Sequence, residues 1–256
     1  METDKITKDK FKEQESQYNF PYHFLVENNE DKIIKPFKVY YWLYDYMRLI
    51  NYLKLKVNEK NYKNILDFGC GEGRFLFELK KKKLDKKFFG FEISESAKLF
   101  FRAFNPEIKL FDKTEDILKY KNYFDVITFS EVIEHIPDEN VKENISLITS
   151  LLKKGGYLFV TAPHKNLPIQ KKHYRHYDSN DLMTNFDQSK FELVSKEFLF
   201  KSSFTKKLLN KIFFNRLFLI NFDFMYKIFF HINKNNFSGN ENNCETIFLT
   251  LKKINE

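Results

Sequence analysis

The apolar residues of this chain change their spacing near residue 62. Before that point they recur at steps of three and four residues, which predicts a helix from about Pro36 to Leu55. Beyond it, short apolar runs alternate with amphipathic segments. The runs predict strands at Asn64–Phe68, Lys87–Glu92, Ile108–Phe111, Phe124–Ser130 and Gly156–Ala162. The amphipathic segments predict helices at Arg74–Lys82, Ser94–Phe104 and Glu139–Leu152.

Apolar strands that alternate with helices are typical of a parallel sheet covered on both faces, and right-handed crossovers make that sheet doubly wound. Two further strands are predicted at Phe191–Phe200 and Thr246–Lys252. We therefore expect an α/β fold in four parts. The first part, residues 1–60, consists of a polar tail at 1–20 and a helical cap. It is followed by a core at 61–200, a helical insert rich in Phe and Lys at 201–243, and the final strand of the core at 244–256.

Composition and charge narrow the class of protein. Apolar residues make up 43% of the chain, which is enough for a core, and the N-terminus does not resemble a signal peptide. Cys70 and Cys244 are too few for a disulfide framework, so we expect a cytoplasmic setting. The net charge is +8, but the lysines are scattered, and we expect no nucleic-acid partner. Phe and Leu alternate with Lys and Arg at 201–234, which leaves peripheral membrane contact, a lid or a dimer surface open.

A glycine-rich turn follows the first core strand, in the stretch NILDFGCGEGR. Gly69, Gly71 and Gly73 leave the backbone bare, and the N–H groups of such a turn point at a ligand. Asp67 would repel a pyrophosphate but suits a ligand that carries an ammonium group. Glu92, at the end of the second strand, occupies the position from which an acid binds ribose hydroxyls. A ribose and an ammonium without phosphates describe S-adenosylmethionine.

Four segments, ILDFGCGEG, FFGFEIS, YFDVITFSEVIEHIPD and LLKKGGYLFVTAP, resemble the successive motifs of class I S-adenosylmethionine-dependent methyltransferases. The resemblance covers about residues 62–165 and the last two strands. It implies a Rossmann-like, doubly wound, seven-stranded sheet whose last strand is antiparallel. The implied cofactor residues are Asp67, Gly69, Cys70, Gly71 and Gly73 for the methionine part, Glu92 for the ribose, Ile93 for the adenine ring, Asp112 (or Glu115) for the adenine amino group, and Ser130 with Glu131 on the methionyl side.

The segment SEVIEHIPD places Glu131, Glu134 and His135 three and four residues apart, on one face if the segment is helical. One hypothesis makes His135 a general base, because histidine titrates near neutral pH. A second makes Glu131, Glu134, His135 and His173 a metal site, since the segment resembles that of small-RNA 3′-terminal 2′-O-methyltransferases. The chain departs from those enzymes at His164, where they carry asparagine. The third interpretation is a turn in which His135 bonds to backbone.

The segment KKHYRHYDSNDL resembles part of the acceptor-pocket wall of many bacterial small-molecule and sugar methyltransferases. The resemblance implies that His173, Arg175 and His176 contact the acceptor, and we expect Glu134 and His164 to join them. Alternatively, His173 and Arg175 brace this loop against the Glu131 segment. Ser179 is the predicted N-cap of the helix that follows.

These patterns together predict a methyltransferase that uses S-adenosylmethionine to methylate a small polar acceptor, at oxygen. A sugar or a lipid-linked intermediate is the expected acceptor, with Glu131, His135 and His173 as catalytic residues. Two alternatives remain: a metal-dependent RNA 2′-O-methyltransferase, and a non-catalytic scaffold that binds the cofactor and activates a partner enzyme.

Overall fold

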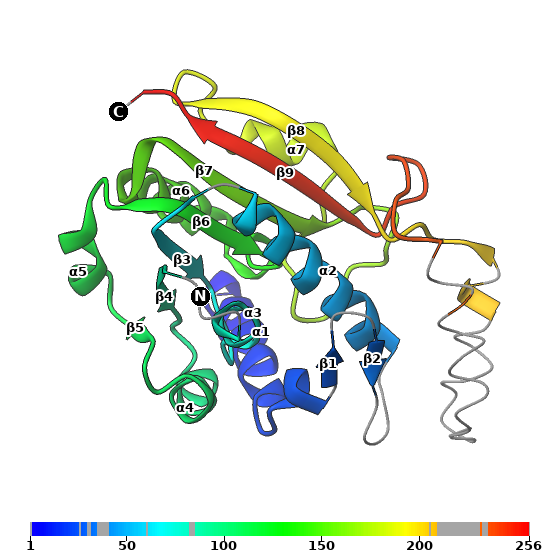
Figure 1. Ribbon diagram of the computed structural model, residues 1–256. Helices are drawn as coiled ribbons and strands as arrows, with labels where there is room; N and C mark the ends of the chain where they lie inside the picture. Colours follow the sequence, from blue (N-terminus) through cyan, green and yellow to red (C-terminus); the bar gives the residue numbers. More distant parts are fainter. Residues whose placement is uncertain are drawn as a thin grey trace.

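The computed structural model describes residues 2–25, 27–29, 32–34, 41–59, 61–81, 85–204, 206–208, 231 and 235–255. A seven-stranded sheet crosses the molecule in the order β5-β4-β3-β6-β7-β9-β8 (Figure 1). The first five strands of this order are parallel, and β9 runs antiparallel between β7 and β8. The strands are β3 (Asn64–Phe68), β4 (Lys87–Phe91), β5 (Lys109–Phe111), β6 (Phe124–Ser130), β7 (Leu152–Pro163), β8 (Phe191–Leu199) and β9 (Thr246–Lys253).

Helices cover the sheet and extend from it. The α-helices are α1 (Glu2–Gln17), α2 (Tyr41–Asn58), α3 (Arg74–Lys80), α4 (Glu95–Phe104), α5 (Thr114–Ile117), α6 (Asp138–Leu151) and α7 (Ser179–Thr184). Three short 3₁₀ turns are η1 (Tyr22–Leu25), η2 (Leu118–Tyr120) and η3 (Ile133–His135), and a small antiparallel pair joins β1 (Glu27–Asn29) to β2 (Lys32–Ile34).

The buried residues of the sheet alternate between two hydrophobic cores, as successive side chains of a strand must. Ile65 of β3 faces a core that includes Leu43, Met47 and Leu53 of α2. Leu66, the next residue, faces a core on the other side that includes residues of α6. The expectation of a sheet buried on both faces is confirmed.

The chain order reverses at β3, which pairs with β4 on one side and β6 on the other. In an open α/β sheet this reversal leaves a crevice outside the carboxyl ends of the strands, and ligands bind there. The glycine turn after β3, Glu92 after β4 and Glu131 after β6 therefore come to one edge of the sheet. Helix α1 lies beside this edge in Figure 1.

The structure corrects several expectations. Residues 2–17 form helix α1, not a polar tail. The cap helix α2 spans Tyr41–Asn58 and ends three residues beyond the expected end, and residues 36–40 of the expected helix lie outside the described residues. The strand expected from Gly156 begins at Leu152, because β7 pairs with β6 from Phe124 onward. Helix α7 is capped by Asp178, whose side chain accepts from the Asp181 N–H, and not by Ser179.

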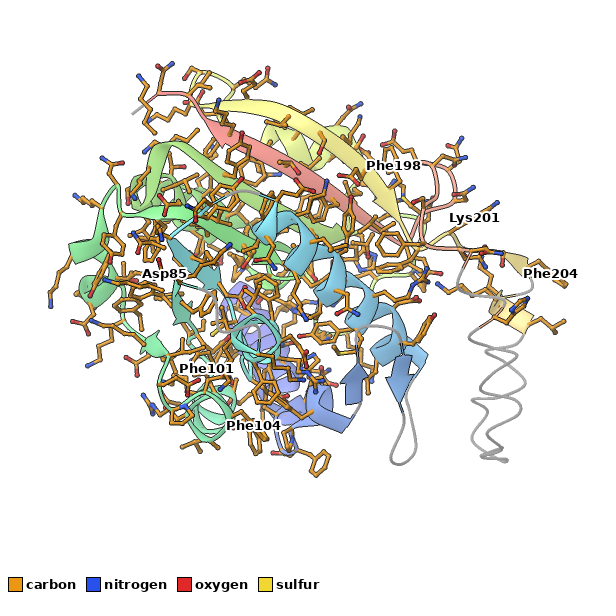
Figure 2. All side chains as sticks on the ribbon, viewed as in Figure 1. Asp85, Phe101, Phe104, Phe198, Lys201 and Phe204 are labelled. Atoms are coloured by element: carbon orange, nitrogen blue, oxygen red, sulfur yellow. The ribbon has the colours of Figure 1, made fainter. Side chains whose placement is uncertain are left out.

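Most of the helical insert expected at 201–234 lies outside the described residues. Lys206 contacts Asp45 of α2 and Glu245 before β9, at 3.0 and 2.7 Å, so the start of the insert is tied to the core. Phe204 projects outward beyond this contact and is 82% exposed (Figure 2). Within the described part of the chain, no helix has the length and apolar character needed to cross a bilayer.

Candidate active site

A cavity of about 470 Å³ opens at the carboxyl ends of β3, β4 and β6. Four parts of the chain line it: helix α1, the ends of β3 and β4, the loop and helix after β6, and the loop before α7. Their lining residues include Thr7, Lys10, Phe11, Gln14, Tyr18, Phe68, Gly69, Glu92, Ile93, Glu131, Val132, His135, Ile136, Pro137, Lys172 and Tyr174. The cavity therefore joins the expected cofactor residues to the expected catalytic residues.

The glycine turn needs glycine for both conformation and space. Gly69 and Gly73 each have φ of 78°, in the left-handed region that other residues rarely adopt. A Cβ on Gly69 would lie 2.5 Å from Val132 Cγ2, and a Cβ on Gly73 would lie 2.5 Å from Phe101 Cδ2. Phe101, on α4, is labelled in Figure 2. Val132 and Phe101 therefore occupy the space that side chains at Gly69 and Gly73 would need, and the turn must keep glycine at both positions.

Asp67 stands at the end of β3, two residues before Gly69, and is buried. Its Oδ1 accepts a 2.6 Å hydrogen bond from the Thr128 hydroxyl. Burial raises the pKa of Asp67 to about 7, although this hydrogen bond opposes the shift. Asp67 lies behind the cavity lining and not in it, and an ammonium group placed beside it would favour its charged form.

Glu92 joins the two loops that border the cavity. Its Oε2 accepts from the Gly71 N–H (2.7 Å), and its Oε1 accepts from the N–H groups of Ile93 (2.9 Å) and Ser94 (2.8 Å). Burial raises the pKa of Glu92, and these three hydrogen bonds oppose the rise. A carboxylate has about four lone-pair positions, so Glu92 can still accept from a ribose hydroxyl.

The other expected cofactor residues differ in their surroundings. Ile93 lines the cavity and is 59% exposed, as a residue that packs on an adenine ring requires. Cys70 is buried within the glycine turn. Ser130 bonds to Thr161 (2.8 Å). Asp112 does not line the cavity, because Lys98 (3.2 Å) and Arg102 (3.5 Å) hold its carboxylate on the surface of α4, and its rival Glu115 is exposed.

The loop after β6 brings two carboxylates together. Glu131 has a φ of 55°, a strained value for a residue with a side chain, and its N–H donates to the Thr161 carbonyl (3.0 Å). Only the short turn η3 follows, so Glu131, Glu134 and His135 do not share a helix face as expected. Glu131 Oε1 and Glu134 Oε2 are both buried and have no hydrogen-bond partner. Orphaned oxygens at a cavity are free to accept a proton or bind a cation.

Burial raises the pKa values of the two carboxyl groups of this loop and lowers the pKa of His135. It raises the pKa of Glu131 to about 7 and that of Glu134 well above its usual value, where the negative charge of Glu131 adds to the rise. The Lys172 ammonium opposes both shifts. Burial lowers the pKa of His135 to about 3, and the same ammonium adds to that shift. The group that titrates near neutral pH is therefore Glu131, whereas the expected base, His135, is held neutral.

His173 comes from a distant part of the chain and packs on His135, with ring centroids 4.6 Å apart. Glu134, His135 and His173 each offer one ligand atom, and these atoms lie within 4.8 Å of one another. Glu131 is not part of this group. The structure thus assembles three of the four residues expected for a metal site.

Arg175 and His164 lie outside the cavity lining. The Arg175 guanidinium donates to the carbonyls of Ile133 (3.2 Å) and Ile136 (2.6 Å), so it braces the loop against the Glu131 segment. This is the alternative to acceptor contact that the sequence left open. His164 is buried, and its Nδ1 accepts from the Asn166 N–H (3.0 Å).

The residues that α1 contributes were missed by sequence reasoning. Lys10 donates to the carbonyls of Lys171 (3.0 Å) and His173 (2.7 Å), and Glu15 accepts from the Ser96 N–H (2.8 Å). These bonds hold α1 over the cavity. The available signal was a run of strong helix formers without Gly or Pro from residue 2 to 17.

Comparison with known proteins now decides the family. A family profile described as "Methyltransferase domain" matches residues 40–198, which is more than half of the chain. The chain belongs to this family of S-adenosylmethionine-dependent methyltransferases. S-adenosylmethionine is the cofactor of the family, so the predicted cofactor is confirmed.

Solved methyltransferases share the fold. A methyltransferase from Archaeoglobus fulgidus superposes with a TM-score of 0.54 at 22% identity, over 84% of this chain and all of that one. A methyltransferase from Methanosarcina mazei gives 0.54 at 14% identity, over 79% of this chain and 97% of that one. These similarities confirm the predicted seven-stranded sheet with its antiparallel last strand.

Curated relatives resemble a shorter part of this methyltransferase. The ubiquinone biosynthesis O-methyltransferase of Pelagibacter ubique is 34% identical over 129 residues, which are 46% of this chain and 50% of that protein. The protein of the same name from Salmonella enteritidis is 30% identical over 111 residues, 41% of this chain and 44% of that protein. The chain spans about half the length of the curated relatives it matches.

Proposed function

We propose that this methyltransferase transfers a methyl group to a hydroxyl oxygen of a small acceptor with an apolar body. The observation that carries the proposal is that Glu131 and His135 line the same cavity as Gly69 and Glu92. Glu131 carries a buried oxygen without a partner and has its pKa raised to about 7 by burial. A general base is most effective when its pKa lies near the working pH.

The donor site fits S-adenosylmethionine in three respects. The glycine turn offers bare backbone, Glu92 can accept from ribose hydroxyls, and Asp67 supplies a negative charge for the ammonium. When bound, the cofactor supplies an activated methyl group on a sulfonium sulfur. An in-line displacement of this kind gains most from alignment of the reacting groups, which an enclosed cavity provides.

The protein's own residues then manage the proton. As the acceptor oxygen forms its bond to the methyl carbon and the carbon–sulfur bond breaks, the hydroxyl proton passes to the Glu131 carboxylate. His135 is neutral, so it lines the cavity beside Glu131 without adding a positive charge. The products are a methyl ether, the thioether form of the cofactor, and a protonated Glu131.

Two observations support this class of acceptor. The cavity lining includes Phe11, Val132, Ile136 and Pro137, which favour an acceptor with apolar surface. This favours the lipid-linked intermediate over a bare sugar. The curated relatives are named as O-methyltransferases, and this supports oxygen as the methylated atom.

Transfer of a tritiated methyl group from S-adenosylmethionine to a panel of apolar alcohols, phenols and sugars tests the proposal. Glu131→Gln keeps the shape but cannot take a proton, and we expect turnover to fall by about 10²- to 10⁴-fold. Cofactor affinity should change little, and Glu115→Gln, an exposed acid, serves as the matched control. Full turnover in Glu131→Gln would refute the role of Glu131. A chain that binds cofactor yet methylates no acceptor would favour the scaffold alternative.

A second candidate mechanism uses a divalent cation at the same site. The observation that favours it is the convergence of ligand atoms from Glu134, His135 and His173 within 4.8 Å. A cation there would lower the pKa of the acceptor hydroxyl, and Glu131 would not be needed as the base. Turnover that is lost in EDTA, restored by Mn²⁺ and abolished in Glu134→Gln would support it. Turnover that EDTA leaves intact would exclude it.

A further inference from the structure

Two histidines, His173 and His176, form a chain of hydrogen bonds that ends on a backbone carbonyl, and a third histidine packs against it. His176 Nδ1 lies 3.0 Å from the Leu167 carbonyl oxygen, and His176 Nε2 lies 2.8 Å from His173 Nδ1. His173 in turn packs against His135. His173 and His176 are only 4% and 5% exposed, so water does not replace these bonds.

The carbonyl determines where the protons lie. An oxygen of this kind only accepts, so His176 must carry its proton on Nδ1. In a neutral ring Nε2 is then bare, and it must accept from His173 Nδ1. His173 therefore also carries its proton on Nδ1, which leaves a lone pair on its Nε2. The partner of one ring nitrogen thus determines which form of the ring is present.

His135 reaches the same form by a separate contact. Its Nδ1 lies 3.3 Å from the Lys172 carbonyl oxygen, so its proton lies on Nδ1 as well and its Nε2 is bare. That Nε2 lies 3.9 Å from Glu134 Oε1. Glu134, His135 and His173 each place one ligand atom within 4.8 Å of the others. With both rings in this form, neither bare Nε2 presents an N–H to the cluster.

We infer that His176 is a positioning residue that fixes His173 in the Nδ1–H form, so that the Nε2 lone pair of His173 faces Glu134 and His135. The inference rests on the proposed function, in which this cluster borders the reacting hydroxyl. The bare imidazole nitrogens of this cluster only accept, which suits a hydroxyl proton or a cation, and either one needs a bare Nε2. Without His176, the proton of His173 is free to move to Nε2 and point a donor into the cluster.

Two variants separate positioning from simple packing. His176→Leu fills similar space but offers no acceptor to His173. His176→Gln restores an acceptor, since its side-chain oxygen can lie near the place of Nε2. His231→Leu changes an exposed histidine and is the control. Thermal unfolding checks that each variant is folded.

Long-range ¹H–¹⁵N correlation spectra of the ¹⁵N-labelled protein report which nitrogen of each imidazole carries the proton. We expect Nδ1–H for His173 in the wild type and the control, Nε2–H or a mixture in His176→Leu, and a return to Nδ1–H in His176→Gln. Turnover should fall by about 10- to 100-fold in His176→Leu and recover in His176→Gln. An Nε2–H form of His173 in the wild type, or an unchanged spectrum in folded His176→Leu, would overturn the inference.

The spectra are recorded without acceptor, so they do not depend on methyl transfer. A wild-type chain with the expected Nδ1–H form but no turnover on any acceptor would refute the proposed function and leave the role of His176 intact. If His176→Leu does not fold, the wild-type and His176→Gln spectra still decide the question.

Discussion

Cofactor binding should release a proton from Asp67, and this makes the affinity depend on pH. Burial raises the pKa of Asp67 to about 7 in the free protein, whereas the cofactor ammonium needs the charged form. The ionised fraction then rises from about 3% at pH 5.5 to about half at pH 7.0. Because only this fraction binds well, the dissociation constant of S-adenosylhomocysteine should fall by about 16-fold over that interval. The ligand ammonium stays largely protonated throughout.

Isothermal titration calorimetry with S-adenosylhomocysteine measures both the affinity and the proton. At pH 7.0, titrations in two buffers with different heats of ionisation should show release of about half a proton per site. Asp67→Asn should bind more weakly at pH 7.0 by about 1.5–3 kcal/mol, roughly 10- to 160-fold, and lose the pH dependence. Thr128→Val removes the hydrogen bond that lowers the Asp67 pKa, so its affinity profile should move to higher pH.

Glu131 also titrates near neutrality, so it needs its own control. Glu131→Gln should keep the slope of affinity against pH if Asp67 is its source. A flat wild-type profile would refute the argument, and so would a slope that survives in Asp67→Asn. In the latter case the proton would come from another acid of the cavity.

Further perturbations test the turn, the N-terminal helix and the insert. Gly73→Ala should lower stability more than Gly155→Ala: both have positive φ (78° and 79°), which costs about 1–2 kcal/mol, but only Gly73 has neighbours within 4 Å of its new Cβ. Equal losses in urea unfolding would contradict this. Lys10→Met should speed amide hydrogen exchange in α1, because two carbonyl contacts are lost; unchanged protection would show that they do not hold the helix. Lys206→Met should destabilise the fold by about 3 kcal/mol in the same urea assay, since the two carboxylates it contacts lose a buried cationic partner; a loss below about 1 kcal/mol would contradict this.

The parts of the site that sequence reasoning predicted are local in the chain. The strand, the glycine turn and the helix after it run from Asn64 to Lys80 without a break. Each conformation there depends on nearby residues: a continuous buried run in β3, left-handed glycines in the turn, and good helix formers in α3. Glu92 could be placed as well, because parallel strands bring their carboxyl ends to one edge.

The parts that it did not predict depend on contacts between distant segments. Lys10 meets the His173 carbonyl across 163 residues, and no local pattern in α1 encodes that partner. Asp112 has the expected place after its strand, yet Lys98 and Arg102 on α4 hold it away from the cavity. The lowered pKa of His135 could not be predicted from the sequence either, because it depends on burial and on the Lys172 ammonium.

Burial is the common cause of the unusual charges at this site, and it gives the proposed reaction a direction. It favours the neutral forms of Asp67, Glu131 and His135 alike, although the Lys172 ammonium at the cavity opposes the shift at Glu131. A bound cofactor adds the ammonium and the sulfonium, and both positive charges favour ionised carboxylates. After transfer the sulfur is a neutral thioether, so that support for a charged Glu131 disappears. The pKa of Glu131 then rises again, at the stage when Glu131 must hold the proton of the acceptor. The carboxylate is therefore a stronger base after the methyl group has moved than before.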